Sequence, residues 1–141
     1  MDNSEISLPA LMRSARQVYG AAMRAALEKV GCDDLPRNGA FVLGAIARGG
    51  VPMSVVIEAV GISKQAGGAL VDTLVNRSYL DRAIDPDDRR RLRVGLTTRG
   101  EEAAAVIRAA IERVDAALVA EVGPEYVAHT RATLEALTAH A

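Results

Sequence analysis

The chain has 141 residues, a formal net charge of −1 and a composition that is 50% hydrophobic, which suffices for one domain with its own core. Only 3% of the residues are aromatic, which argues against a stacking platform for single-stranded nucleic acid. No apolar run approaches the roughly 18 residues of a membrane span, and a single cysteine cannot form an internal disulfide. We therefore expect a cytoplasmic protein with no membrane partner.

A long amphipathic helix is predicted over about residues 8–30. Its apolar residues recur at helical spacing: Leu8, Leu11, Met12, Ala15, Val18, Tyr19, Ala22, Met23, Ala26, Leu27 and Val30. This stripe is too long for one small core to cover. The segment Cys32-Asp-Asp-Leu-Pro36 ends the helix.

Three shorter helices are predicted next. The first covers residues 37–48 and ends at Gly49-Gly50, and Pro52 suits the first turn of the second. Gly61 then makes a tight turn, and Ser63 can cap the third helix. A helix, a glycine turn and a capped helix form a helix-turn-helix signature.

A β-hairpin with a cationic tip is predicted from Leu80 to Leu96. Leu80–Ile84 forms one strand, and in the other strand apolar residues alternate with Arg91, Arg93 and Gly95. Four arginines and three aspartates lie between Asp85 and Leu96. A helix-turn-helix followed at once by such a hairpin is a winged helix-turn-helix, in which the hairpin is the wing. The alternative interpretation is a solvated charged hairpin.

Two further helices are predicted over residues 98–139. Thr98 and Glu101 fit a capping box, the first helix stops at Gly123-Pro124, and both helices carry apolar stripes. Together with the helix at 8–30 they have excess apolar surface, which usually marks a dimer. The alternative is a monomer in which these helices cover each other.

These observations predict one domain over residues 1–141, mainly α with a small β-wing. The winged helix-turn-helix spans about 36–99, and the dimerisation helices that flank it span about 8–30 and 98–139.

The chain resembles the MarR family of dimeric winged helix-turn-helix regulators over essentially its whole length. The most specific match runs from Asp88 through Leu96-Thr97 to Gly100, and fits the family's wing motif: an Asp, any residue, an Arg, and a strand closing on Leu-Thr with a Gly three residues beyond the Thr. A second match, Gly61-Ile-Ser-Lys-Gln-Ala66, resembles the start of the family's recognition helix. The chain departs from the family in its small residues at 67–69 and in Ser78, where the family usually has Gly.

The resemblance implies a homodimer that places two recognition helices in successive major grooves and two wings over the minor grooves. It also implies that Arg90 enters the minor groove, steadied by Asp88. Many members of the family lose DNA when a small, often phenolic, molecule binds between the dimer helices and the winged unit.

The candidate DNA-binding residues of the recognition helix lie near its start: Ser63, Lys64, Gln65, Gly68 and Ala69. Gln65 can pair bidentately with adenine, and Lys64 can reach guanine or a phosphate. An ordinary polar surface is the alternative. On a helical projection Ala66 faces the core with Leu70 and Leu74.

Two adjacent glycines, Gly67 and Gly68, each cost about 1 kcal/mol relative to Ala in a helix. One interpretation is that they let the backbone approach DNA closely. The alternatives are neutral sequence drift in a protein that contacts few bases, or tight packing against a neighbouring helix.

The candidate residues of the wing are Asp88, Arg89, Arg90, Arg91 and Arg93. Each arginine would gain from phosphates or from a narrow groove, and Asp88 would fix the rotamer of Arg90.

A candidate effector pocket on the first helix comprises Met12, Arg16, Tyr19 and Met23, with Arg16 pairing a carboxylate; the same spacing also fits a plain dimer core. No catalytic constellation is present, and Cys32 is expected to be inert beside two aspartates. His129 and His140 lack partners at metal-ligand spacing, so no metal or cofactor is expected.

The predicted function is that of a cytoplasmic homodimeric transcription regulator, not an enzyme, which binds a pseudo-palindromic duplex as a repressor that a small aromatic or phenolic effector releases. One alternative is a dimeric ligand-binding or interaction protein on the same scaffold, with weak or non-specific DNA binding. Another is a DNA-architectural protein with little sequence preference.

Overall fold

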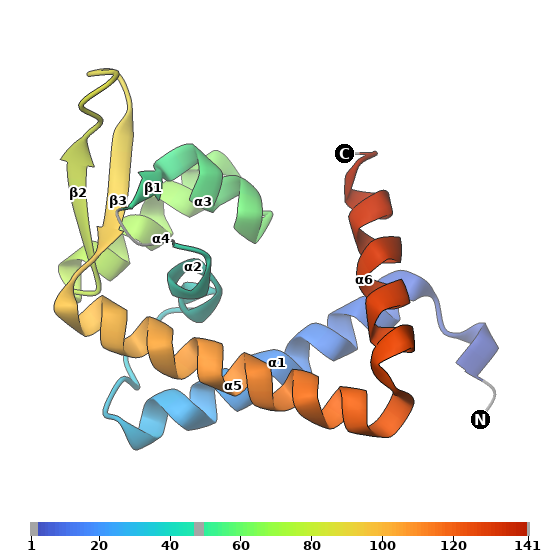
Figure 1. Cartoon of the computed structure of the whole chain (residues 1–141). Helices are drawn as coiled ribbons and strands as arrows, with labels where there is room; N and C mark the ends of the chain where they lie inside the picture. The colour runs from blue at the N-terminus through green and yellow to red at the C-terminus, as the bar shows by residue number, and fades with distance from the viewer. Residues whose placement is uncertain (1–2, 47–49, 141) are drawn as a thin grey trace.

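The computed structural model describes residues 3–46 and 50–140, and the architecture is mainly helical with one small sheet (Figure 1). In chain order the elements are a short 3₁₀ helix (Asn3–Glu5), α1 (Leu8–Lys29), α2 (Gly39–Ala45), β1 (Val51–Pro52), α3 (Met53–Val60), α4 (Lys64–Asn76), β2 (Leu80–Ile84), β3 (Leu92–Leu96), α5 (Thr98–Val122) and α6 (Pro124–Thr138). The predicted fold class, mainly α with a small β-wing, is confirmed.

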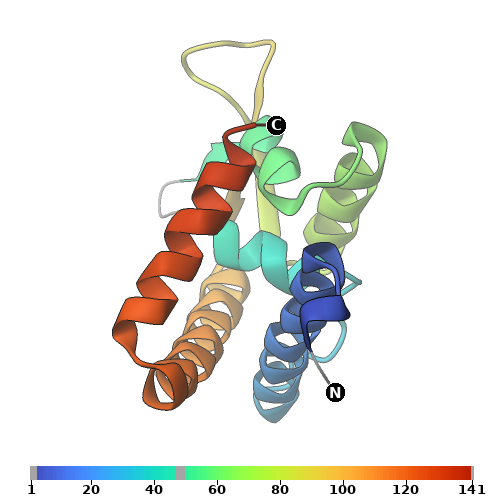
Figure 2. The same ribbon diagram turned by 90° about the vertical axis from the view of Figure 1, so that its right-hand side faces the viewer.

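The long helices α1 and α5 pack against each other, and the winged unit, residues 39–46 and 50–96, lies to one side of them (Figure 1). Helix α2 packs on α5 and so joins the two parts. Helix α6 turns back from the far end of α5, and the β2–β3 hairpin projects from the body (Figures 1 and 2). Among the residues that the structure describes, no helix has the length and apolar character of a membrane span.

The helix-turn-helix forms as the sequence predicts. Gly61 adopts a φ of +71°, a left-handed conformation that glycine tolerates best, and ends α3. The side-chain oxygen of Ser63 then accepts a hydrogen bond of 3.1 Å from the backbone N–H of Ala66, which caps α4. The first turn of α4 is thereby presented at the surface.

The sheet has three strands in the order β1-β3-β2, one more than the predicted hairpin. Strands β2 and β3 pair antiparallel from Leu80↔Leu96 to Ile84↔Leu92. Strand β1 pairs antiparallel with the middle of β3 through Val51↔Val94 and Pro52↔Arg93. Strand β1 was not predicted, because a strand of two residues is too short to show an alternation of apolar and polar residues. Pro52 lies in this strand and precedes the first turn of α3, one position earlier than expected.

The start of α5 differs from the predicted capping box by one residue. The N-cap is Thr97, whose hydroxyl accepts a 3.0 Å hydrogen bond from the N–H of Gly100. The predicted cap at Thr98 is therefore wrong, because Glu101 lies one position too far along for the pair. A Cβ at Gly100 would lie 2.0 Å from the carbonyl oxygen of Tyr79, so only glycine fits there.

Two other boundaries differ in detail. The second helix begins at Gly39, after an N-cap at Asn38, and not at residue 37. It ends at Ala45, where Ile46 is the C-cap in an extended conformation, so the predicted continuation to residue 48 is wrong; Gly49 lies outside the described residues. Ser78, where the family usually has Gly, adopts a left-handed conformation with a φ of +66°.

The core lies where α1, α2 and the winged unit meet the first half of α5. Fully buried side chains include Met23, Leu43, Leu74, Leu80, Val94 and Ile107. The second half of α5 and all of α6 contribute no buried residue. Large apolar side chains instead remain exposed on α1, α5 and α6: Leu8, Leu11, Val18, Leu118, Val122, Tyr126, Leu134 and Leu137.

Candidate DNA-binding surface

The exposed start of α4 carries most of the predicted base-contacting residues. Ser63, Lys64, Gln65 and Ala69 are exposed, and Gly68 is half-buried. Ala66 is also exposed, which contradicts the helical projection that placed it in the core. The buried stripe comprises Gly67, Leu70, Val71 and Leu74. The buried face differs from the helical projection because α3 packs against Gly67 rather than against Ala66.

The two adjacent glycines have different surroundings. A Cβ at Gly67 would lie 2.5 Å from Cγ1 of Ile57 on α3, a distance that real contacts do not reach. A Cβ at Gly68 would meet only the Cε of Met53, at 3.7 Å, which is ordinary contact. Tight packing of α3 on α4 therefore explains Gly67, whereas nothing within the described protein demands glycine at 68.

An ion pair links the outer face of α4 to the wing. The guanidinium of Arg82 on β2 donates a hydrogen bond to the carboxylate of Asp72. Asp72 projects from the same outward side of α4 as Gln65 and Ala69. Because the pair has no net charge, Asp72 adds no net negative charge to this face of α4. Sequence reasoning overlooked this pair, although opposite charges on α4 and β2 were a signal for it.

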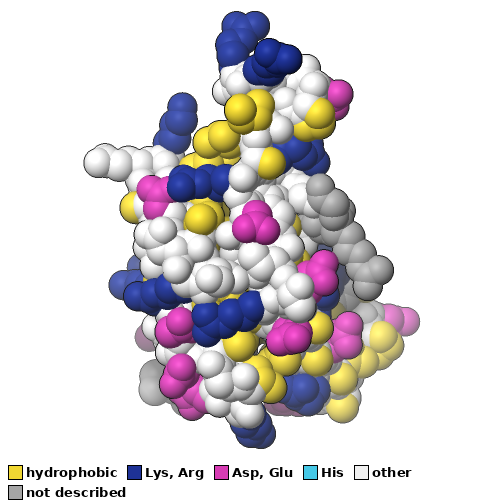
Figure 3. Space-filling view, turned by 90° about the vertical axis from the view of Figure 1, so that its left-hand side faces the viewer, with side chains coloured by type: hydrophobic (Ala, Val, Ile, Leu, Met, Phe, Trp, Pro, Cys, Tyr) yellow, Lys and Arg dark blue, Asp and Glu magenta, His cyan; other side chains and the backbone are white. Residues whose placement is uncertain are grey.

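The tip of the wing presents exposed cationic side chains. Arg89, Arg90 and Arg91 are all exposed, and the side chain of Arg90 is 95% accessible. Lys and Arg side chains project from this end of the molecule in Figure 3. Asp88 accepts a 3.0 Å hydrogen bond from the backbone N–H of Arg90, and its carboxylate lies 3.8 Å from Nε of the same residue. Asp88 thus shapes the turn that displays Arg90.

Arg93 lies apart from the other wing arginines. Its Nη2 donates a 2.9 Å hydrogen bond to the carbonyl of Gly50, and its Nη1 lies 3.6 Å from the carboxylate of Asp85. Asp85 is only 3% exposed, and it also accepts a 2.9 Å hydrogen bond from the N–H of Asp87. The guanidinium of Arg93 therefore fastens the wing to the chain before β1. This position differs from the expectation that Arg93 contacts DNA as the tip arginines do.

A cluster of polar residues fixes the winged unit to α5. The hydroxyl of Tyr79 and the guanidinium of Arg99 both donate to the carboxylate of Asp34, the latter at 3.1 Å. Arg99 also stacks on the ring of Tyr79, with 4.2 Å to its centroid, and donates a 2.6 Å hydrogen bond to the carbonyl of Arg77. We name these four residues the junction cluster. They come from the loop after α1, the C-cap of α4, the turn before β2 and the first turn of α5.

The junction cluster perturbs two acids. The hydrogen bond from Tyr79, helped by the charge of Arg99, lowers the pKa of Asp34 below its usual value. Burial and the hydrogen bond to Asp34 raise the pKa of Tyr79 above its usual value. No pattern in the sequence indicates this cluster, because its members come from three separate stretches of the chain and match no motif.

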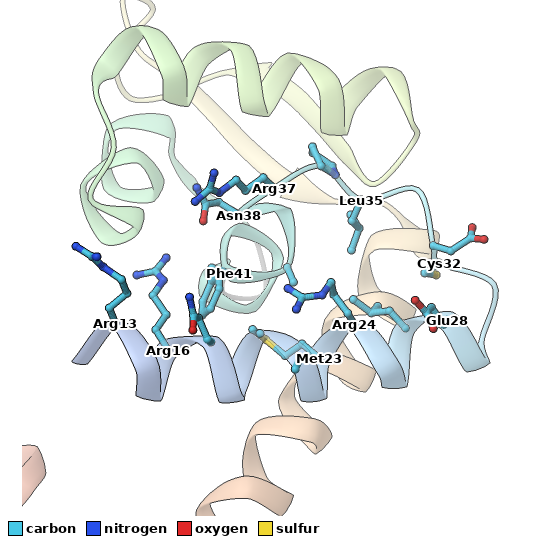
Figure 4. Close-up of a pocket in the computed structure, with 17 residues that line it drawn as sticks. Arg13, Arg16, Met23, Arg24, Glu28, Cys32, Leu35, Arg37, Asn38 and Phe41 are labelled. Atoms are coloured by element: carbon cyan, nitrogen blue, oxygen red, sulfur yellow. The ribbon is translucent and has the colours of Figure 1, made fainter. Parts of the chain in front are cut away.

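The predicted effector residues divide between two places. Arg16 and Met23 line a cavity of about 880 Å³ between α1, the loop over residues 32–38 and α2 (Figure 4). Tyr19 points to α5 instead, where its hydroxyl donates to Asp115, and this hydrogen bond raises the pKa of Tyr19. Met12 is half-buried and lines neither this cavity nor the smaller groove beside Tyr19.

Helix α3, the turn at Gly61, the capped helix α4 and the projecting hairpin define a winged helix-turn-helix protein. Residues 33–91 match the model of the MarR family, and over these residues the chain is MarR-like, as the resemblance implied. That family consists of transcriptional regulators and not of enzymes. No curated protein matches the sequence significantly.

Several solved structures share the fold over nearly the whole chain. S. aureus MepR in its DNA-binding conformation has 19% identity and a TM-score of 0.77, over 96% of this chain and 98% of MepR. NadR in complex with 4-hydroxyphenylacetate has 17% identity and a TM-score of 0.76, over 97% of this chain and 96% of NadR. The transcriptional repressor CouR, bound to a 23-mer DNA duplex, has 20% identity and a TM-score of 0.73, over 98% of this chain and 96% of CouR.

Proposed function

We propose that this protein is a homodimeric transcription regulator of the cytoplasm that binds a pseudo-palindromic DNA duplex, most simply as a repressor. One observation carries the proposal. The exposed first turn of α4 and the exposed arginines of the wing tip belong to a single winged unit, whose sheet and turn set their spacing. A basic hairpin beside a capped helix is the arrangement that contacts both grooves of a duplex.

The first turn of α4 enters the major groove. Gln65 contacts adenine through its side-chain amide, and Lys64 contacts guanine or a phosphate. Since Gly68 and Ala69 have no polar side chain, direct base contact is concentrated in this turn.

The wing lies over the minor groove. Arg90 enters the groove, where a narrow width strengthens the attraction for a guanidinium, and Arg89 and Arg91 bind phosphates. Arg93 and Asp88 position the wing rather than contact the duplex.

Dimerisation follows from the apolar side chains exposed on α1, α5 and α6. A patch of this kind on three helices is larger than isolated surface residues would give, and it favours a second copy of the chain as its partner. Two copies related by a two-fold axis then present two winged units to the two halves of a pseudo-palindromic site.

Release of DNA by a small aromatic or phenolic effector completes the proposal. The structural likeness to NadR, solved with 4-hydroxyphenylacetate, supports this class of ligand. The cavity beside Arg16 and Met23 lies between α1 and the winged unit, where a ligand can change the relative positions of the two parts.

The alternative, a dimeric ligand-binding protein with weak DNA binding, is favoured by the small residues at 68 and 69 of α4. The affinity ratio between a selected duplex and a scrambled duplex at physiological salt distinguishes the two. A regulator should show a ratio of at least about 10³. Gln65→Ala should reduce this ratio, and Arg108→Ala, at an exposed arginine of α5, should leave it unchanged. A ratio near one for the unmodified protein would favour the alternative.

A further inference from the structure

We propose that the side of the wing that faces α4 binds the strand of DNA backbone that separates the two grooves. Arg82 binds a phosphate of that strand, and Ile84 and Leu92 pack against its deoxyribose rings. The inference rests on the proposed function, since it needs α4 and the wing tip to lie in neighbouring grooves. It adds three residues of β2 and β3 to the DNA-binding surface and gives the ion pair of Arg82 with Asp72 a role.

The alternation of the hairpin places these side chains on one side of the sheet. In the register of β2 and β3, Arg82 lies opposite Val94. The next pair on that side is Ile84 with Leu92. Side chains two residues apart on a strand, and those directly opposite on the neighbouring strand, share a side of the sheet. Since Arg82 contacts Asp72 of α4, this shared side is the one that faces α4.

Arg82 lies where α4 and the hairpin meet. In the proposed complex α4 lies in a major groove and the wing tip lies over a minor groove. One strand of the backbone separates a major groove from the neighbouring minor groove, so that strand passes between α4 and the wing tip. The guanidinium of Arg82 contacts α4 while its backbone belongs to β2. A phosphate of the separating strand is therefore the group that Arg82 meets.

The ion pair with Asp72 orients Arg82 and leaves it able to bind a phosphate. The side chain of Arg82 is 38% accessible and that of Asp72 is 55% accessible. An ion pair with this exposure contributes little to stability, so stability alone does not account for it. A guanidinium has five N–H donors, which suffice for a carboxylate and a phosphate oxygen at once. Asp72 is thus a positioning residue for Arg82.

Ile84 and Leu92 form an apolar step between Arg82 and the wing tip. They are 63% and 44% exposed, and they pair directly across the hairpin. In Figure 3, hydrophobic side chains lie on the projecting hairpin below its cationic end. Exposing two apolar side chains to water costs free energy, and a covering partner removes that cost. Arginines on both sides of the step favour a polyanion, and a DNA strand offers the apolar carbon edges of deoxyribose next to its phosphates.

The salt dependence of DNA binding measures the phosphate contact. Arg82→Gln alone would leave Asp72 unpaired beside the duplex, so the test combines Arg82→Gln with Asp72→Asn, which keeps the net charge. This double variant should bind both the selected and the scrambled duplex more weakly, with a salt slope lower by about one unit. Glu112→Gln with Arg113→Gln, a matched exchange at two exposed residues of α5, should leave the slope unchanged. An unchanged slope in the Arg82 double variant would overturn the phosphate contact.

Asp72→Asn alone tests the positioning role. Arg82 keeps its charge in this variant, so the salt slope should not fall. A guanidinium that is no longer fixed can reach phosphates in more than one register, and phosphate contacts are what fix the register of a protein on the duplex. The ratio of selected to scrambled affinity should therefore fall by at least about threefold. An unchanged ratio would overturn the positioning role of Asp72.

Ile84→Ser with Leu92→Ser tests the apolar step. This variant should bind both duplexes about fivefold or more weakly with an unchanged salt slope, because an apolar contact releases no counterions. Ala83→Ser, at an exposed residue on the other side of the same strand, should bind as the unmodified protein does. Unchanged affinity in the double variant would overturn the apolar contact. A smaller assembly in sedimentation, with unchanged DNA affinity, would mean that these side chains bind a second copy of the chain instead.

The scrambled duplex separates this proposal from the proposed function. Phosphates and sugars are the same in every sequence, so the losses should appear with the scrambled duplex as well. An unmodified protein that binds both duplexes equally would contradict the sequence-specific regulator, and losses in the variants would still support the backbone contact. An unmodified protein that binds no duplex would contradict both.

Discussion

Arg90 and Arg93 both belong to the wing, but their surroundings differ. Those of Arg90 leave it available to bind a ligand, and those of Arg93 make it a support of the wing. Among the residues that the structure describes, Arg90 pairs with Asp88 alone, and its side chain is almost fully exposed. Arg93 is half-buried and bridges Gly50 and the buried carboxylate of Asp85. An exposed arginine contributes little to stability and remains available to a ligand, whereas removing the partner of a buried carboxylate is costly.

Substituting these two arginines should therefore give opposite results. Arg90→Gln should weaken binding to every duplex and lower the salt slope by about one unit, with unfolding free energy changed by less than about 0.5 kcal/mol. Arg93→Gln should lower the unfolding free energy by about 1–3 kcal/mol, because Asp85 loses its charged partner. Urea unfolding and salt-dependent DNA binding measure both effects. Unchanged DNA affinity for Arg90→Gln would mean that the hairpin is not a DNA wing.

The two glycines of α4 give a second test at this scale. Gly67→Ala should destabilise the protein by about 1–3 kcal/mol, because the new methyl group overlaps Ile57. Gly68→Ala should stabilise it by up to about 1 kcal/mol, since alanine favours the helix and the site has room. Urea unfolding of both variants checks the pair.

The same variants show whether the backbone at Gly68 approaches DNA. If it does, Gly68→Ala should weaken binding to the selected duplex more than binding to random DNA. If Gly68→Ala stabilises the protein and leaves binding to the selected duplex unchanged, Gly68 is a neutral substitution with no role in DNA binding.

At the scale of elements, the junction cluster determines how the winged unit is held on α5. Asp34 accepts hydrogen bonds from Tyr79, in the turn before β2, and from Arg99, in the first turn of α5. The pKa of Asp34 is lowered in the folded state. Its stabilising contribution is therefore present above the unfolded-state pKa of about 3.9, and is lost as the pH falls through the lower folded-state pKa.

This linkage predicts a pH-dependent difference between variants. Asp34→Asn should be less stable than the unmodified protein at neutral pH, and the difference should shrink as the pH falls through about 4 toward 3. The effect should be modest because Asp34 is 40% exposed. Asp33→Asn, at an exposed neighbour, serves as the control and should follow the unmodified protein. A difference for Asp34→Asn that stays constant across this pH range would contradict the ionic role.

The elements differ in how well the sequence predicts them. Long helices with a regular apolar stripe, such as α1 and α5, and a helix with a polar cap, such as α4, are predicted because their signals are local. Strand β1 and the junction cluster could not be predicted, because both exist only through contacts between distant segments. The buried face of α4 was misplaced by one residue for the same reason: the neighbouring helix α3, and not the helical period, selects Gly67 as the contact.

The residues of the candidate site also divide into those that local sequence signals predict and those whose roles depend on distant parts of the chain. The wing tip was predictable from its density of arginines, but the separate role of Arg93 depends on Gly50, which lies far away in the sequence. Of the candidate effector residues on α1, Arg16 and Met23 line the cavity and Tyr19 faces α5, and the effector pocket itself stays a prediction. Helical spacing places residues on a face but does not tell which neighbour that face meets.

At the scale of the whole molecule, α6 has no buried residue in the single chain, and exposed apolar side chains continue across α1 and α5. A second copy of the chain would cover them. Obligate dimer interfaces often bury more than about 2,000 Å² and are strongly apolar.

Sedimentation equilibrium should therefore show a dimer at low micromolar concentration. Introducing charge at two exposed apolar positions of α6, Leu134→Glu with Leu137→Glu, should shift the protein toward monomer. Ala132→Glu, on the same helix, should leave the dimer intact. A monomer for the unmodified protein would contradict both the dimer and the half-site geometry.

Selection of bound duplexes from a random library tests sequence-specific DNA binding by a dimer, because it examines sequence preference and symmetry together. A dimer that places one α4 in each half-site should enrich a two-fold motif, with half-sites about 10 base pairs apart from centre to centre. Within each half-site the preference should be confined to the few base pairs that Lys64 and Gln65 reach. Enrichment of a single half-site would contradict the dimeric arrangement, and a library that remains random would contradict sequence-specific regulation itself.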